Sequence, residues 1–216
     1  MLVLASASPR RQELLRNAAI SFTVQLTNIP EIPRPHESAK EVAERLAREK
    51  ALAVSHDHPR EFVLGADTVV VVNGEILGKP DNHADAARML RLLSGRTHQV
   101  ITGVCLVVPK NLSINHQRAT IKNQQNVARH SLASGSALED TRSETTLVTV
   151  ADLSPDDIRF YISTGEPMDK AGAYAIQGIA SRWIPRIEGD YSNVVGLPIA
   201  LVYRMLREHG CGLERR

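Results

Sequence analysis

The stretch that organises this chain is Phe62-Val63-Leu64-Gly65-Ala66-Asp67-Thr68-Val69-Val70-Val71-Val72, followed by Asn73-Gly74. Its apolar, largely β-branched run is typical of a strand that is buried on both faces of a sheet. An Asn-Gly pair favours a tight turn, so the pattern predicts a hairpin directly after this strand. The sequence therefore predicts a central strand that carries one acid, Asp67, among its apolar residues.

Helical and strand patterns alternate on either side of this segment. The spacing of apolar residues predicts helices over residues 38–55, 81–93, 154–164 and 197–209, and strands over residues 2–5, 20–26, 98–108, 145–150 and 182–187. This alternation indicates the α/β class. Residues 109–142 are polar and break the pattern, which predicts a surface insertion or a long mobile hairpin in a single domain spanning residues 1–216.

Composition excludes several classes of protein. The chain has 216 residues, 43% of them hydrophobic, which is enough for a globular core. No apolar run reaches the roughly 18 residues of a membrane-spanning helix, so we expect a soluble, cytoplasmic protein with no membrane partner. Two cysteines argue against a disulfide framework or a zinc site, and a net charge of +2 argues against a nucleic-acid-binding surface.

A first candidate binding site lies at the turn Ser6-Ala7-Ser8-Pro9-Arg10-Arg11. Ser8 is a natural N-cap and Pro9 a natural first helical residue, so the helix should present unpaired N–H groups at this turn. Those groups, the hydroxyls of Ser6 and Ser8 and the guanidinium groups of Arg10 and Arg11 suit phosphate oxygens. The same residues also fit an ordinary capped surface helix with solvated arginines.

Asp67 is the second candidate. A carboxylate inside a buried strand costs several kcal/mol of desolvation unless a cation or metal compensates it. Asp67 therefore indicates a site at this point of the strand. The alternative is an aspartate that is satisfied by neighbouring backbone donors.

Two lysines form the third candidate. Only six of the 26 basic residues are lysines, and Lys50 and Lys79 lie at the end of a predicted helix and in Gly78-Lys79-Pro80. A retained lysine in an arginine-rich chain suggests that a compact point charge is needed. The alternative, a solvated helix end, fits Lys50 better than Lys79.

Residues 164–178 form the fourth candidate, because small residues there would let backbone approach a ligand closely. Asp169 and Lys170 supply adjacent charges, and Gln177 can both donate to and accept from the edge of a base. The segment could equally be a tight structural crossover. Neither a P-loop nor a Rossmann glycine motif occurs in the sequence.

Taken together, these segments resemble the Maf family of nucleoside triphosphate pyrophosphatases. The resemblance rests on seven ordered blocks, at residues 4–11, 46–51, 65–69, 77–80, 93–98, 164–178 and 189–198. It implies a mixed, twisted sheet flanked by helices, with a deep central cleft between two lobes, as in Maf and inosine triphosphatase-like proteins. It also implies hydrolysis of a nucleoside triphosphate to the monophosphate and pyrophosphate, dependent on Mg²⁺ or Mn²⁺, and a homodimer.

The resemblance assigns roles to individual residues. Asp67 matches the proton acceptor of the family, and Arg10, Thr68 and Gln177 match residues of the branch that prefers dTTP and UTP. Glu31 stands where the family has an acidic pair, so it is expected to hold the metal together with Asp67.

The hypothesis of mechanism combines these roles with the charges. Arg10, Arg11, Lys50 and Lys79 would bind the triphosphate and neutralise the leaving pyrophosphate. Asp67 and Glu31 would hold the metal and accept a proton from water, while Thr68 and Gln177 would read the base. Two alternatives stay open from the sequence: a non-catalytic, nucleotide-binding regulator of cell division, and the same chemistry on a methylated guanine nucleotide.

Overall fold

A mixed β-sheet built around β3 forms the centre of the molecule. The computed structural model describes residues 1–109 and 138–212. Its strands are β1 (Leu2–Leu4), β2 (Thr23–Val24), β3 (Phe62–Val72), β4 (Glu75–Leu77), β5 (Thr97–Val108), β6 (Leu138–Thr149) and β7 (Arg186–Glu188). They are ordered β2-β1-β3-β5-β6-β7, with β4 paired separately to β3. β1 is parallel to β2 and β3 and the other pairs are antiparallel, so the predicted mixed α/β fold is confirmed.

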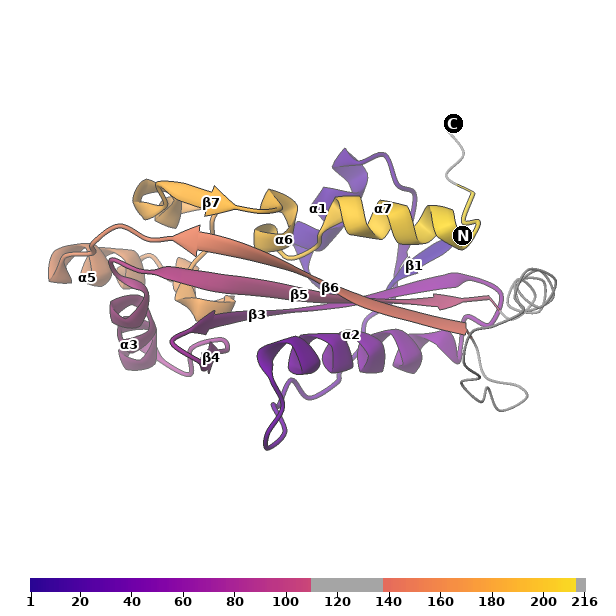
Figure 1. The fold of residues 1–216 in the computed structure, drawn as a ribbon, viewed down its shortest axis with the longest axis horizontal. Coiled ribbons are helices and arrows are strands. Elements are labelled where there is room, and N and C mark those ends of the chain that lie inside the picture. Colours follow the sequence, from indigo (N-terminus) through magenta and orange to yellow (C-terminus); the bar gives the residue numbers. More distant parts are fainter. Residues whose placement is uncertain (110–137, 213–216) are drawn as a thin grey trace, which may run out of the picture.

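Helices cover both faces of this sheet (Figure 1). They are α1 (Pro9–Asn17), α2 (Ala39–Ser55), α3 (His83–Leu93), α5 (Pro155–Ser163), α6 (Tyr191–Val195) and α7 (Ile199–Glu208), with 3₁₀ turns at Glu166–Asp169, Ala171–Ala173 and Ile179–Trp183. α2 lies along one face, and α1, α6 and α7 lie on the opposite face (Figure 1). None of the described helices is long and apolar enough to cross a membrane.

The alternation of side chains along β3 decides which residues face which layer. Val63 and Val69 pack with residues of α2. Leu64 belongs to the core beneath α1 and α7, and Val70 belongs to the core beneath α3 and α5. Asp67 is an even number of positions from Val63 and Val69, so its side chain lies on the same face of β3 and faces α2.

Two glycines let α2 lie directly against the sheet. A Cβ atom added to Gly65 of β3 would lie 2.1 Å from the carbonyl oxygen of Ala47, and one added to Gly103 of β5 would lie 2.3 Å from that of Ala43. Any side chain at these positions would push the helix outward. The close approach is what brings Lys50, one turn further along α2, to the level of Asp67.

Replacing Gly65 therefore tests the packing of α2. We expect Gly65→Ala to lower the free energy of unfolding by about 3 kcal/mol, because the new methyl group meets backbone atoms that cannot move alone. Urea unfolding measures the loss. Gly212→Ala is the matched control, since a Cβ there meets nothing within 4 Å. Equal stability of the two variants would contradict the close approach.

One edge of β3 is only partly paired. β1 pairs with Phe62–Leu64 and β4 pairs with Val70–Val72 on this edge, whereas β5 covers the other edge from Val63 to Val71. Within residues 1–109 and 138–212, no strand therefore pairs with residues 65–69 on the first side, and Asp67 lies at their centre. An unpaired edge inside a sheet must be covered by other groups, and the candidate site lies here.

The predicted polar insertion is wrong at its C-terminal end. β6 begins at Leu138, seven residues before the predicted strand at Thr145, and pairs with β5 from Val108 to Thr97. The side chains in the first half of β6 are only partly buried, so polar residues are tolerated there. The backbone hydrogen bonds to β5 make this segment a strand although its composition does not predict one. Residues 110–137 of the predicted insertion lie outside the described residues, and the single-domain organisation stays a prediction.

Two predicted edge strands are also shorter in the structure. β2 contains only Thr23–Val24 of the predicted residues 20–26, because its partner β1 is itself only three residues long. β7 contains only Arg186–Glu188 of the predicted residues 182–187, after a 3₁₀ turn at Ile179–Trp183. Pro185 precedes β7 and has no N–H group to donate to a ladder, which limits the strand.

Candidate active site

A cavity of about 520 Å³ lies at the open edge of β3. All twelve residues that the sequence proposes for binding or catalysis line it: Ser6, Ser8, Arg10, Arg11, Glu31, Lys50, Asp67, Thr68, Lys79, Asp169, Lys170 and Gln177. They come from six regions of the chain that are separated in sequence: residues 6–11, 31, 50, 67–68, 79 and 169–177. The fold thus joins the four candidate segments in one place.

A chain of alternating charges crosses the cavity. Lys50 Nζ lies 2.6 Å from Asp67 Oδ1 and 2.6 Å from Glu31 Oε1, and Lys79 Nζ lies 2.8 Å from Glu31 Oε2. Asp67 and Lys50 are only 6% and 7% exposed. The alternative of a solvated Lys50 is therefore wrong, because its ammonium group is buried between two carboxylates.

The two carboxylates in this row of charges, Asp67 and Glu31, differ in their affinity for protons. Desolvation raises the pKa of Asp67 above its usual value, although Lys50 and Arg11 oppose the shift. Partial burial would also raise the pKa of Glu31, but hydrogen bonds from Lys50 and Lys79 outweigh it and lower that pKa to about 2. Two acids whose pKa values are pushed apart suit different roles. Asp67 is the one suited to accept a proton.

Most of the N–H groups of the Arg11 guanidinium donate hydrogen bonds to other groups of the protein. Its Nε donates to the carbonyl of Gly196 at 2.8 Å, and its Nη1 donates to the carbonyl of Ala66 at 2.9 Å and to Ser6 Oγ at 3.2 Å. Its Nη2 donates to Thr68 Oγ1 at 3.1 Å. Arg11 thus covers the unpaired edge of β3 and ties it to the turn after α6.

Thr68 belongs to the same network. Its hydroxyl lies 3.0 Å from that of Thr102 and 3.4 Å from the carbonyl oxygen of Gly196, in addition to accepting from Arg11. Thr102 in turn donates to the carbonyl of Asn193 at 3.1 Å. The hydroxyl of Thr68 is therefore fully engaged by protein groups in this structure.

Ser6 and Ser8 shape the turn before α1. Ser8 is the N-cap, and its Oγ accepts from the backbone N–H of Arg11 at 3.5 Å, while Ser6 Oγ accepts from the backbone N–H of Ser8 at 3.2 Å. Within the described residues, Arg10 makes no hydrogen bond or ion pair. Its guanidinium group is thus available to a ligand at the helix N-terminus.

Residues 169–177 supply another part of the cavity wall. Lys170 Nζ lies 2.5 Å from Asp169 Oδ1 and donates to the carbonyl of Glu166 at 3.0 Å. The hydrogen bond from Lys170 lowers the pKa of Asp169. Gln177 is exposed and makes no hydrogen bond to the part of the chain that the structure describes. Its amide can therefore bind a ligand without breaking an existing contact.

The chain matches a known protein family over nearly its whole length. The family model described as Maf-like protein matches residues 1–209. The chain belongs to the Maf family.

Curated Maf relatives cover nearly the same length. The chain is 52% identical to the dTTP/UTP pyrophosphatase of Koribacter versatilis over 209 residues, which are 97% of this chain and 94% of that protein. It is 47% identical to the dTTP/UTP pyrophosphatase of Symbiobacterium thermophilum, with the same shares of the two chains. Among solved structures, the Ham1 protein of Staphylococcus aureus matches with 14% identity, a TM-score of 0.46 and coverage of 96% of this chain and 98% of that one. A likeness of that size carries no inference about this Maf chain.

Two carboxylates that line the cavity of this Maf protein, Asp67 and Glu31, are the candidate protein ligands for a divalent cation. Within residues 1–109 and 138–212, no group of three or more His, Cys, Asp or Glu residues is placed to hold a metal. Asp67 and Glu31 supply two carboxylates on opposite sides of Lys50. Mg²⁺ commonly takes one or two protein carboxylates and completes its shell with water and substrate phosphates, so this donor set fits such an ion.

Sequence reasoning missed the apolar wall of the Maf cavity. Val70, Val100, Tyr174, Ile176 and Val194 line it together with the polar residues. In the sequence these residues follow ordinary core patterns, so no local signal separates them from the rest of the core. Tyr174 and Ile176 are exceptions, because they lie in the small-residue segment 164–178 that the sequence singled out.

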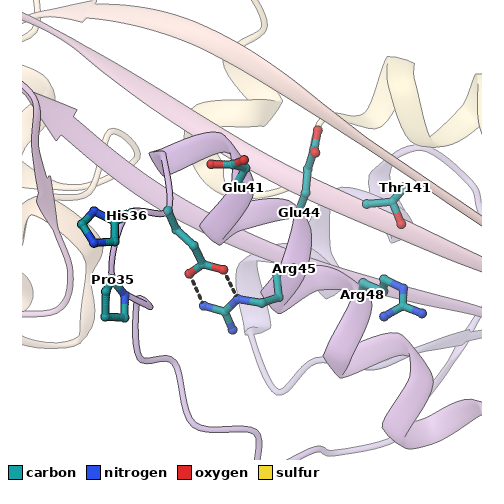
Figure 2. Close-up of a pocket in the computed structure, with 8 residues that line it drawn as sticks. Pro35, His36, Glu41, Glu44, Arg45, Arg48 and Thr141 are labelled. Carbon is teal, nitrogen blue, oxygen red and sulfur yellow. Dashed lines mark hydrogen bonds and ion pairs between the residues drawn. The ribbon is translucent and has the colours of Figure 1, made fainter.

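A second hollow, of about 460 Å³, lies on the outer side of α2 and contains none of the predicted residues. Both carboxylate oxygens of Glu37 accept hydrogen bonds from Arg45, and Figure 2 shows Glu41 and Glu44 pointing away from Arg45. Arg45 pairs with Glu37 and Arg48 pairs with Glu139, so both guanidinium groups already have a carboxylate partner and we assign no chemistry to this hollow.

Proposed function

We propose that this Maf protein hydrolyses dTTP and UTP to the monophosphate and pyrophosphate. The observation that carries the proposal is Asp67, a buried acid with a raised pKa, in a cavity that is also lined by five basic side chains: Arg10, Arg11, Lys50, Lys79 and Lys170. The names of the curated relatives support the reaction and the pyrimidine substrates.

In this mechanism the cations of the cavity bind the triphosphate. Arg10 and Lys79 would contact phosphate oxygens, and the N-terminus of α1 would add N–H donors. Lys50 would neutralise charge that develops on the leaving pyrophosphate, since it lies at the centre of the site. Arg11 would hold the strand edge and the turn in place rather than bind phosphate with a free guanidinium group.

Asp67 would accept a proton from the attacking water. The water oxygen forms a bond to one of two phosphorus atoms, the α or the β. The bond between that phosphorus and the oxygen that bridges the two then breaks. The products are the nucleoside monophosphate and pyrophosphate. Glu31, whose pKa is about 2, would stay ionised and keep Lys50 and Lys79 in position.

A divalent cation, Mg²⁺ or Mn²⁺, would be held by Asp67 and Glu31 and would neutralise phosphate charge when bound. A homodimer and a cytoplasmic location are further parts of the proposal that stay predictions. Size-exclusion chromatography with light scattering tests the dimer.

Base selection would fall to Gln177, because the hydroxyl of Thr68 is already engaged by Arg11 and Thr102. We expect Gln177→Ala to reduce the preference for dTTP and UTP over purine nucleotides about tenfold, with a smaller effect on kcat, since one amide pair with a base is removed. Steady-state kinetics with each nucleotide measure this. Gln12→Ala, on the surface of α1, is the control. An equal fall for all substrates would contradict base reading by Gln177.

Pyrophosphate release from a panel of nucleoside triphosphates, with and without Mg²⁺, tests the function itself. We expect the highest kcat/KM for dTTP and UTP. Turnover concentrated on a methylated guanine nucleotide would overturn the substrate assignment. Binding of nucleotides without release of pyrophosphate would instead favour a non-catalytic regulator.

A further inference from the structure

A buried histidine, which the mechanism above does not use, lies behind the apolar wall of the cavity. His98 of β5 is 2% exposed and does not itself line the cavity. Its Nε2 lies 2.8 Å from the hydroxyl oxygen of Tyr174, and the two rings meet edge to face with centroids 5.3 Å apart. Tyr174 does line the cavity, so His98 contacts the site through it.

His98 is in its neutral form in this environment. Burial lowers the pKa of the imidazole to about 4. Its Nδ1 is buried and has no hydrogen-bond partner among the described residues. A buried ring nitrogen without a partner is uncommon in a protein core, so the presence of a histidine at this position needs an explanation.

The backbone next to Tyr174 is strained. Gly172 and Ala173 have φ values of 69° and 57°, and the second of these is rare for a residue with a side chain. A Cβ at Gly172 would also lie 2.9 Å from Val70 Cγ1. Such a backbone persists only when surrounding contacts hold it.

Among the residues that the structure describes, three hydrogen bonds join residues 172–175 of this turn to parts of the protein that are distant in sequence. Gly172 donates to the carbonyl of Gly78 at 3.0 Å, Tyr174 pairs with His98, and the backbone N–H of Ala175 donates to the Tyr161 hydroxyl at 3.1 Å. The turn connects Lys170 to Gln177, and both of those side chains face the cavity. The His98 contact is the one that joins the turn to the central sheet through side chains.

We propose that His98 is a positioning residue for nucleotide binding: it holds Tyr174, and Tyr174 fixes the turn that presents Lys170 and Gln177 to the substrate. The proposal rests on the proposed function for the identity of the nucleotide. Asp67 and Lys50 lie on β3 and α2 and not on this turn. Loss of the contact therefore reduces the fraction of molecules whose turn is ready to bind, and raises KM without lowering kcat in proportion.

The test combines His98→Leu, Tyr174→Phe and the double variant. We expect each single variant to raise KM for dTTP and the Kd of the non-hydrolysable α,β-imido-dUTP about tenfold, with kcat of His98→Leu within threefold of wild type. The double variant should bind no more weakly than either single variant, because both remove one contact. Tyr174→Phe keeps the ring and removes a single oxygen, so it tests the contact even if His98→Leu does not fold.

A control separates positioning from a general loss of stability. Val202→Ala removes methyl groups from the fully buried core beneath α7, away from the turn, and should lower the thermal midpoint while leaving KM unchanged. Hydrogen exchange adds a direct readout: amides of residues 171–177 should exchange faster in Tyr174→Phe and regain protection with α,β-imido-dUTP, while those of β3 stay unchanged.

The outcomes are distinguishable from those of the proposed function. Folded single variants with wild-type KM and Kd would overturn the proposal, as would additive effects in the double variant. A wild-type protein that releases no pyrophosphate would overturn the proposed function. The Kd and exchange measurements would still decide the role of His98 in that case.

Discussion

Asp67→Asn should lower kcat about a thousandfold, because the amide cannot accept the proton that the attacking water loses. Nucleotide binding should persist or strengthen, since the substitution removes a negative charge from a site that receives a polyanion. The fold should also persist, because the amide has the shape of the carboxylate and Lys50 keeps its ion pair with Glu31 at 2.6 Å. Pyrophosphate release and calorimetric titration with α,β-imido-dUTP measure the two effects.

Asp57→Asn is the matched control for this variant. Asp57 lies just beyond the end of α2, and its side chain is 75% exposed, so the same chemical change there should leave kcat unchanged. Wild-type turnover in Asp67→Asn would remove Asp67 from the mechanism. A parallel loss of binding and turnover would show that Asp67 holds the substrate and does not act on water.

Lys50→Met should lower the free energy of unfolding by about 3 kcal/mol at pH 7, because it leaves Asp67 buried without its ion-pair partner. The loss should depend on pH. Desolvation already raises the pKa of Asp67 in the folded protein, and removal of the lysine raises it further. A carboxyl group with a raised folded pKa destabilises the protein as pH rises through that value, so the deficit should be small at low pH and grow toward neutrality.

The pH dependence of kcat/KM should show the same rise in the pKa of Asp67. Asp67 must be ionised to accept a proton, so the rising limb of the profile of kcat/KM against pH should move to higher pH in Lys50→Met. Lys40→Met is the stability control, on the same helix and with a side chain that is 64% exposed; we expect a loss of at most about 0.5 kcal/mol. Urea unfolding of both variants at several pH values measures the difference. Equal stability of the two at pH 7 would contradict the buried ion pair.

Much of the fold could be predicted from local patterns. The apolar run at Phe62–Val72, the Asn73-Gly74 turn and the N-cap Ser8 all match observed elements, because each depends on residues adjacent in sequence. The boundary of β6 could not be predicted in this way. Its residues from Leu138 onward are strand because β5 offers a ladder, and a partner strand is invisible to composition.

Asp67 could be proposed as part of the candidate site without coordinates, because an acid in a buried strand needs compensation wherever the strand lies. The groups that compensate it could not be predicted, since they come from segments that only the folded chain brings together. Gly65 lets α2 approach closely enough for Lys50 to meet Asp67, while Glu31 arrives from a proline-rich loop whose course no local rule specifies. The role of Arg11 was likewise decided by the gap between β1 and β4, since the carbonyl of Ala66 that it covers becomes available only when the sheet is assembled.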